Sequence, residues 1–140
     1  MGPNYFIMFP EYKFAVVKFQ TEALTYQEAI RINEEYKSDP DFSNIQYLLV
    51  MIDRNCIPHF KSKDLKEISD IYNTESQTNN HKTIVWLVSA PLITAFAHIF
   101  VSKTKDNSIY CSTIRKAYDL LNIEISFTDF KLLINKQKNI

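Results

Sequence analysis

The residues of this chain with the clearest chemical potential lie in one short segment between Asp53 and His59. Asp53 and Arg54 offer a carboxylate and a guanidinium group, and His59 offers an imidazole. Because a guanidinium group binds carboxylates and phosphates well, we interpret the segment as a set of polar contacts for a small ligand. The competing interpretation is that Asp53 turns the chain and Arg54 is solvated, since polar clusters are common in surface loops.

Cys56 lies in the same segment and points to a different class of protein. A cysteine acts as a nucleophile when a positive neighbour or a base favours its thiolate form. Arg54 and His59 are near it in sequence, which suggests, as an alternative, a small cysteine-dependent enzyme with His59 as the base. We favour an inert loop thiol, because no third group is available to orient the histidine. Cys111 is expected to be a small core residue.

The three histidines do not form a metal-binding pattern. His59, His81 and His98 are far apart in sequence, and Cys56 with His59 supplies only half of a chelating site. Gly2 is the only glycine, which excludes the glycine-rich loops that hold nucleotide phosphates. We therefore expect no metal and no cofactor.

Strand and helix patterns alternate along the chain. Continuously apolar stretches are typical of strands buried on both faces of a parallel sheet, and aromatic, β-branched residues at the start favour a hairpin. The predicted strands are 5–9, 14–20, 47–52, 84–88 and 109–111. These patterns predict an α/β fold with a mixed, mostly parallel sheet of four to five strands. Residues 53–58 are expected to form a loop.

About four helices are expected to flank the sheet. Thr25 and Glu28 form a capping box, in which the threonine accepts from the third amide and the glutamate reaches back. Ser62 is placed to cap the second helix. The predicted helices begin at Thr25, near Ser62, near Pro91 and after Ser112 or Thr113, and one more short helix is expected in the tail from Thr128.

Length and composition favour one soluble domain. The 140 residues are typical of a single domain, with a core expected over about 5–123 and a C-terminal extension over 124–140 that docks on it. The net charge of zero gives no support for a nucleic-acid partner. No apolar run approaches the ~20 residues of a membrane span. Two cysteines form no disulfide framework, so we expect a cytoplasmic protein.

Four stretches of the sequence follow one another in an order that has a counterpart among known families. They are the hairpin 5–20 with the capped helix from Thr25, the segment 39–42 leading into 47–53, the segment 82–91, and 109–113 followed by 115–121. Together they resemble the STAS domain superfamily, in particular its SpoIIAA-like branch. The resemblance implies a non-enzymatic regulatory module, similar to anti-sigma-factor antagonists and to the cytoplasmic domains of anion transporters.

The resemblance also implies a class of partner, which is another protein or a small apolar, lipid-like or anionic ligand. The chain departs from the antagonists at their phosphorylatable serine, because Arg54, Asn55 and Cys56 follow Asp53 where an Asp-Ser-Ser-Gly pattern would be. Ligands of open sheets bind beyond the carboxyl ends of the strands. We therefore predict ligand contacts from the following four residues: Asp53, Arg54, His59 and Ser62.

Aromatic residues crowd the N-terminal hairpin and suggest a third class of function. Side chains alternate along a strand, so a two-stranded ribbon cannot bury all its aromatic residues on one face. Surplus aromatic residues often mark a partner surface. As a further alternative we expect a structural homodimer through the hairpin, which polar substitutions of Phe6 and Phe14 would dissociate.

Overall fold

The computed structural model describes residues 3–61, 63–64, 66–67, 70, 83–88 and 108–137. The main sheet consists of β1 (Tyr5–Phe9), β2 (Phe14–Phe19), β4 (Tyr47–Ile52), β6 (Thr83–Val88) and β7 (Ser108–Cys111). A second, two-stranded sheet consists of β3 (Ala23–Thr25) and β5 (Ile57–His59). The helices are α1 (Tyr26–Ser38), α4 (Ile114–Leu121) and α5 (Phe127–Ile134), with short 3-10 turns at Pro10–Tyr12 and Phe42–Asn44.

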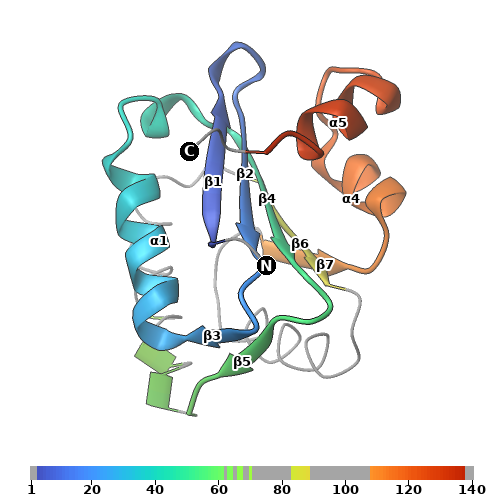
Figure 1. The fold of residues 1–140 in the computed structure, drawn as a ribbon. Helices are drawn as coiled ribbons and strands as arrows, with labels where there is room; N and C mark the ends of the chain where they lie inside the picture. Colours follow the sequence, from blue (N-terminus) through green and yellow to red (C-terminus); the bar gives the residue numbers. More distant parts are fainter. Residues whose placement is uncertain are drawn as a thin grey trace.

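The strands of the main sheet lie side by side in their order along the chain, β1-β2-β4-β6-β7. The hairpin of β1 and β2 is antiparallel, and every later pair is parallel. The expected α/β class and the mixed, mostly parallel sheet are thus confirmed. Helix α1 covers one face of the sheet, and α4 and α5 cover the other (Figure 1).

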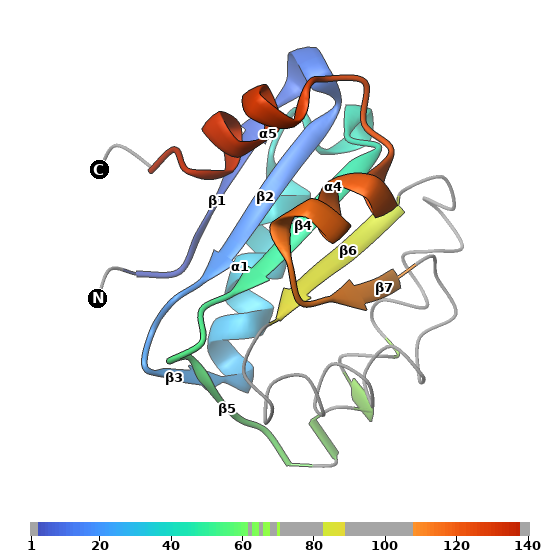
Figure 2. The same ribbon diagram turned by 90° about the vertical axis from the view of Figure 1, so that its right-hand side faces the viewer.

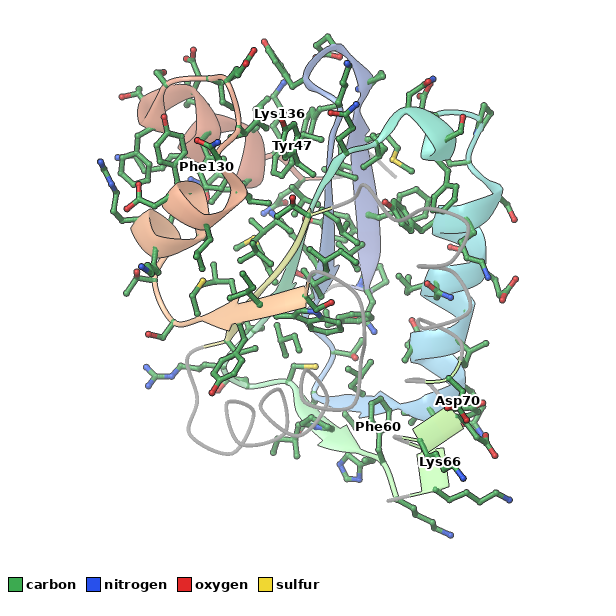
Figure 3. The ribbon with its side chains drawn as sticks, turned by 180° about the vertical axis from the view of Figure 1, so that it is seen from behind. Tyr47, Phe60, Lys66, Asp70, Phe130 and Lys136 are labelled. Atoms are coloured by element: carbon green, nitrogen blue, oxygen red, sulfur yellow. The ribbon has the colours of Figure 1, made fainter. Side chains whose placement is uncertain are left out.

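Part of the expected helical content falls outside the residues that the structure describes. The helix expected from Pro91 lies there entirely, and so does the cap residue Ser62. Five residues of the expected second helix are described, and all are helical: Lys63, Asp64, Lys66, Glu67 and Asp70. Figure 3 shows Lys66 and Asp70 beside the first turn of α1, where the Tyr26 hydroxyl also meets the Glu67 carboxylate.

Alternation along the central strands divides the core into two clusters. On β2, Ala15, Val17 and Phe19 belong to the cluster under α1. Phe14 and Val16 belong to the cluster under α4 and α5. Both faces of β2 are therefore buried. Burial on both faces explains why the central strands are apolar at nearly every position and not only at alternate positions.

The capping box at Thr25 forms only in part. The Thr25 hydroxyl accepts from the N–H of Glu28 at 3.2 Å, as expected. The Glu28 carboxylate does not reach back to Thr25; it pairs with Arg31 and accepts from Asn4 at 3.3 Å. A charge-assisted hydrogen bond from a guanidinium group is stronger than one from a neutral backbone amide. The Glu28 carboxylate therefore pairs with Arg31 instead of with the N–H of Thr25.

The structure contains two short strands, β3 and β5, that were not expected from the sequence. Residues 53–58 do not form a continuous loop, because Ile57–His59 pairs in parallel with Ala23–Thr25. Strands of three residues are too short to display an alternating pattern, and Pro58 argues against a strand. The proline is tolerated because a strand in a two-stranded sheet has one side free of partners.

The C-terminal helix α5 is part of the core. Phe130 and Ile134 are fully buried, and the Phe130 ring lies 5.7 Å from Phe14 and 5.3 Å from Tyr118 between ring centroids. Figure 3 shows Phe130 on the side of the sheet where α4 and α5 lie. The short helix expected from Thr128 is thus present, and Ser126 caps it by accepting from the N–H of Asp129 at 3.1 Å.

We predict that Phe130→Ala lowers the free energy of unfolding by about 3–5 kcal/mol, because it leaves a cavity between α5 and β2. Urea denaturation followed by circular dichroism measures the change. Leu132→Ala, on the exposed side of the same helix, is the matched control and is expected to change stability by less than ~0.5 kcal/mol. Equal effects of the two substitutions would contradict the docking of α5.

Candidate functional site

Three parallel strands end level with one another at one edge of the sheet. Phe19 is in register with Ile52, and Ile52 is in register with Val88. The three strands therefore end at a common edge of the sheet, beside the small sheet of β3 and β5 (Figure 2). This is the edge at which open α/β sheets bind ligands, and the predicted site segment begins there.

Asp53 turns the chain immediately after β4. Its N–H donates to the carbonyl of Phe19 at 2.9 Å, which prolongs the pairing of β2 and β4 by one bond. Its side-chain oxygen accepts from the N–H of Asn55 at 2.9 Å, and its carbonyl accepts from the N–H of Cys56 at 2.9 Å. Asp53 thus has a structural role in the turn, as the competing interpretation of the sequence expected.

The far end of the turn is held by the small sheet. The N–H of Ile57 donates to the carbonyl of Glu22 at 2.9 Å, and β5 then pairs with β3. Because Thr25 at the end of β3 caps α1, the turn is connected by backbone hydrogen bonds to the start of that helix. The segment therefore has a fixed backbone from Asp53 to His59.

The other three residues predicted to contact a ligand are Arg54, His59 and Ser62. Arg54 and His59 are exposed, and neither side chain forms an ion pair with another described residue. Ser62 lies outside the described residues, so its predicted ligand contact has no structural description. At the helix start beside it, the Asp64 carboxylate accepts from the N–H of Lys61 at 2.9 Å.

Cys56 faces the interior although its neighbour Arg54 is exposed. The side chain is fully buried, in the cluster under α1. Burial raises the pKa of the Cys56 thiol to about 11, the nearby Asp53 carboxylate adds to the rise, and a hydrogen bond with Thr21 opposes it. At neutral pH the group is a thiol, which is the opposite of what a nucleophile needs. Cys111 is also buried, as expected for a small core residue.

Asn4 is a buried polar residue of this edge that sequence reasoning missed. Its side-chain oxygen accepts from the N–H groups of Gln20 at 2.7 Å and Thr21 at 3.1 Å. Its amide nitrogen donates to the Thr21 hydroxyl at 3.0 Å and to the Glu28 carboxylate at 3.3 Å. One side chain thus fixes the exit of β2 against the start of α1, and no local pattern marks it because all partners are distant in sequence.

The described residues contain neither a candidate metal site nor a candidate membrane span. No three His, Cys, Asp or Glu side chains gather there in a way that would hold a metal ion. No helix of that part of the chain has the length and apolar character needed to cross a bilayer.

Comparisons of the chain with protein-family models, with curated proteins and with solved structures give no match. The resemblance to the STAS superfamily therefore remains a prediction.

We predict slow alkylation of Cys56 in the native protein. In a Cys111→Ser variant at pH 8, iodoacetamide should react at least about a hundredfold more slowly than with the same chain in denaturant, because burial blocks access and suppresses the thiolate. The native rate should rise with pH toward 11, since the thiolate appears only there. Rapid native labelling, followed by mass spectrometry, would restore the cysteine-dependent enzyme as a candidate.

We predict that Asn4→Asp lowers the free energy of unfolding by about 1–3 kcal/mol at pH 7, because a carboxylate then faces Glu28 and a donor is lost. Repulsion raises the pKa of the new carboxyl in the folded state. The loss relative to the wild type should therefore shrink as the pH falls and the carboxyl becomes protonated. Asn44→Asp, at an exposed position, is the control in the same denaturation assay. A loss independent of pH would contradict the contact.

Proposed function

We propose that this chain is a non-enzymatic, STAS-like regulatory or ligand-binding module that recognises an anionic group at the carboxyl edge of its parallel strands. Arg54 is the main contact, and His59 is an accessory contact. The anionic group belongs either to a small molecule or to the surface of a protein partner.

One observation carries the proposal, which is a turn of fixed backbone that presents an exposed guanidinium group with no ion pair to another described residue. The turn at Asp53 and Asn55 is closed by two internal hydrogen bonds and anchored to Phe19 and Glu22. A fixed backbone reduces the conformational entropy that a ligand must overcome on binding. The side chain of Arg54 is exposed and has no acidic partner among the described residues, so its charge is available.

The chemistry of the loop supports a binding role over catalysis. An enzyme of the alternative class needs the thiolate of Cys56 and a base in contact with it. Burial is the largest cause of the raised pKa of the Cys56 thiol, the Asp53 carboxylate raises it further, and the hydrogen bond with Thr21 lowers it less. Asp53 has the wrong charge to stabilise a thiolate. The group of this loop that is suited to bind a ligand at neutral pH is therefore the Arg54 guanidinium, not the Cys56 thiol.

Titration with inorganic phosphate at low ionic strength tests the proposal. In two-dimensional nitrogen–proton spectra of the wild type, the amides of Arg54, Asn55 and Cys56 should shift saturably. Arg54→Gln should abolish these shifts, because it removes the charge while its turn stays closed by Asp53. Arg115→Gln is the matched control, since Arg115 is also exposed but pairs with Asp119 at 3.4 Å on α4.

The proposal is contradicted if the shifts in the turn do not saturate, or if Arg54→Gln leaves them unchanged. A further comparison separates the two sources of the anion. Native mass spectrometry of freshly purified protein reveals a retained small molecule as extra mass that disappears under denaturing conditions. A clean native mass together with saturable phosphate shifts favours an anionic group on a protein partner.

A further inference from the structure

The hydroxyl group of Thr21 joins three segments of the chain at the carboxyl edge of the sheet. It accepts from the side-chain amide of Asn4 at 3.0 Å, and it donates to the carbonyl of Ala23 in β3 at 3.1 Å. It also forms a hydrogen bond with the thiol of Cys56, the last residue of the turn that presents Arg54. A hydroxyl has one donor and two acceptor positions, so these three contacts use its full capacity.

Asn4 holds Thr21 from the residues that precede β1. Its side chain is 3% exposed. The amide oxygen accepts from the N–H groups of Gln20 and Thr21, and the nitrogen donates to the Thr21 hydroxyl and the Glu28 carboxylate. The Pro3 carbonyl, one residue earlier, accepts from the side chain of Gln20 at 2.7 Å. With all four positions of its amide used, the side chain of Asn4 has one favourable orientation, and that orientation fixes Thr21.

Cys56 connects Thr21 to the binding turn. The N–H of Cys56 closes the turn on the carbonyl of Asp53 at 2.9 Å. Arg54 and Asn55 are therefore the two central residues of the turn. The side chain of Cys56 is fully buried, so the Thr21 hydroxyl anchors the closing residue of the turn from the inside. The orientation of Arg54 thus depends on a side chain that is not part of the turn.

This anchor differs in kind from the two other anchors of the turn. The N–H of Asp53 donates to the carbonyl of Phe19, and the N–H of Ile57 donates to the carbonyl of Glu22. Both are backbone hydrogen bonds that belong to the pairing of strands. The contact of Thr21 uses a side chain, so it can be lost while both sheets remain paired. Because a looser turn leaves more conformational entropy for a ligand to overcome, this contact influences affinity.

We propose that Thr21 is a positioning residue of the anion site, and that Asn4 controls the affinity of Arg54 for an anion through it. The inference rests on the proposed anion binding and adds its regulation. When Asn4 is seated, the Thr21 hydroxyl holds Cys56 and the turn stays closed. When Asn4 is displaced, the hydroxyl loses a partner and rotates more freely, which loosens the turn. An event at the residues before β1 therefore weakens binding at Arg54.

The first test measures the turn without a ligand. Thr21→Val keeps the branched shape and removes the hydroxyl, whereas Thr21→Ser keeps the hydroxyl. Hydrogen exchange by nuclear magnetic resonance should show the N–H of Cys56 exchanging at least about threefold faster in Thr21→Val, and near the wild-type rate in Thr21→Ser. Ser126→Ala is the control, because it destabilises the chain through the cap of α5, away from β3 and β5 (Figure 1). It should leave the exchange of Cys56 unchanged.

The second test measures the dissociation constant for inorganic phosphate from the amide shifts of Arg54 and Asn55. Thr21→Val and Asn4→Ala should each raise this constant at least about threefold, as expected for the net loss of one hydrogen bond. Thr21→Ser and Ser126→Ala should bind like the wild type. The double variant with Asn4→Ala and Thr21→Val should bind no more weakly than the weaker single variant, because both substitutions act through the same hydroxyl.

Unchanged exchange and affinity in Thr21→Val overturn this inference, and so does a loss in Thr21→Ser as large as that in Thr21→Val. Additive losses in the double variant overturn the route from Asn4 through Thr21. A loss of affinity in Ser126→Ala would show that general destabilisation is the cause, which also overturns the inference. Wild-type shifts that do not saturate overturn the anion binding itself, so the two proposals fail in different samples.

Discussion

Strand β2 is apolar on both faces, and the rest of the structure depends on covering them. Its alternate side chains feed two separate clusters, so one helical layer could not bury the strand. Helix α1 covers one cluster, and α4 with α5 covers the other. At 25–30 cal/mol per Å² of buried apolar surface, roughly 1.5–3 kcal/mol accompanies each fully buried large side chain. Phe14, Val16, Leu49 and Val85 are among the residues that the second layer keeps dry.

The edge at which we propose binding follows from the same arrangement. Parallel strands in register end together, and residues that continue beyond Ile52 must leave the sheet where β2 also ends. Asp53 meets this requirement by closing a turn, and the turn sends neighbouring side chains in opposite directions. Cys56 enters the cluster under α1, whereas Arg54 remains in solvent. The turn is therefore the reason why the Cys56 thiol is shielded from solvent and the Arg54 guanidinium is accessible to it.

Much of the fold could be predicted from the sequence, since its signals are local. The runs 47–52 and 84–88 are strands within a residue of their expected bounds, because five or six consecutive apolar residues are unambiguous between polar loops. The cap at Thr25 depends on residues three apart. The strand at 57–59 and the role of Asn4 could not be predicted, because both depend on partners that only the folded chain brings near.

The sequence indicates where the candidate site lies, but it indicates less well which side chains of the segment are exposed and which are buried. The end of an apolar run indicates a loop at the sheet edge, and Arg54 is indeed exposed there. The direction of each side chain in a turn depends on backbone angles that sequence spacing does not reveal. Cys56 and His59 are close along the chain, yet one is buried and the other exposed on β5. Nearness in sequence therefore overestimates the chance of a catalytic pair.

The level ends of β2, β4 and β6 limit how this chain can diverge. A deletion of one residue inside β4 would shift every following side chain to the opposite face, so that residues shaped for contact with α1 would meet α4. Two compensating deletions in neighbouring strands would not restore the packing, because each strand faces both layers. Related chains should therefore differ in length between the strands and keep the number of residues within them constant.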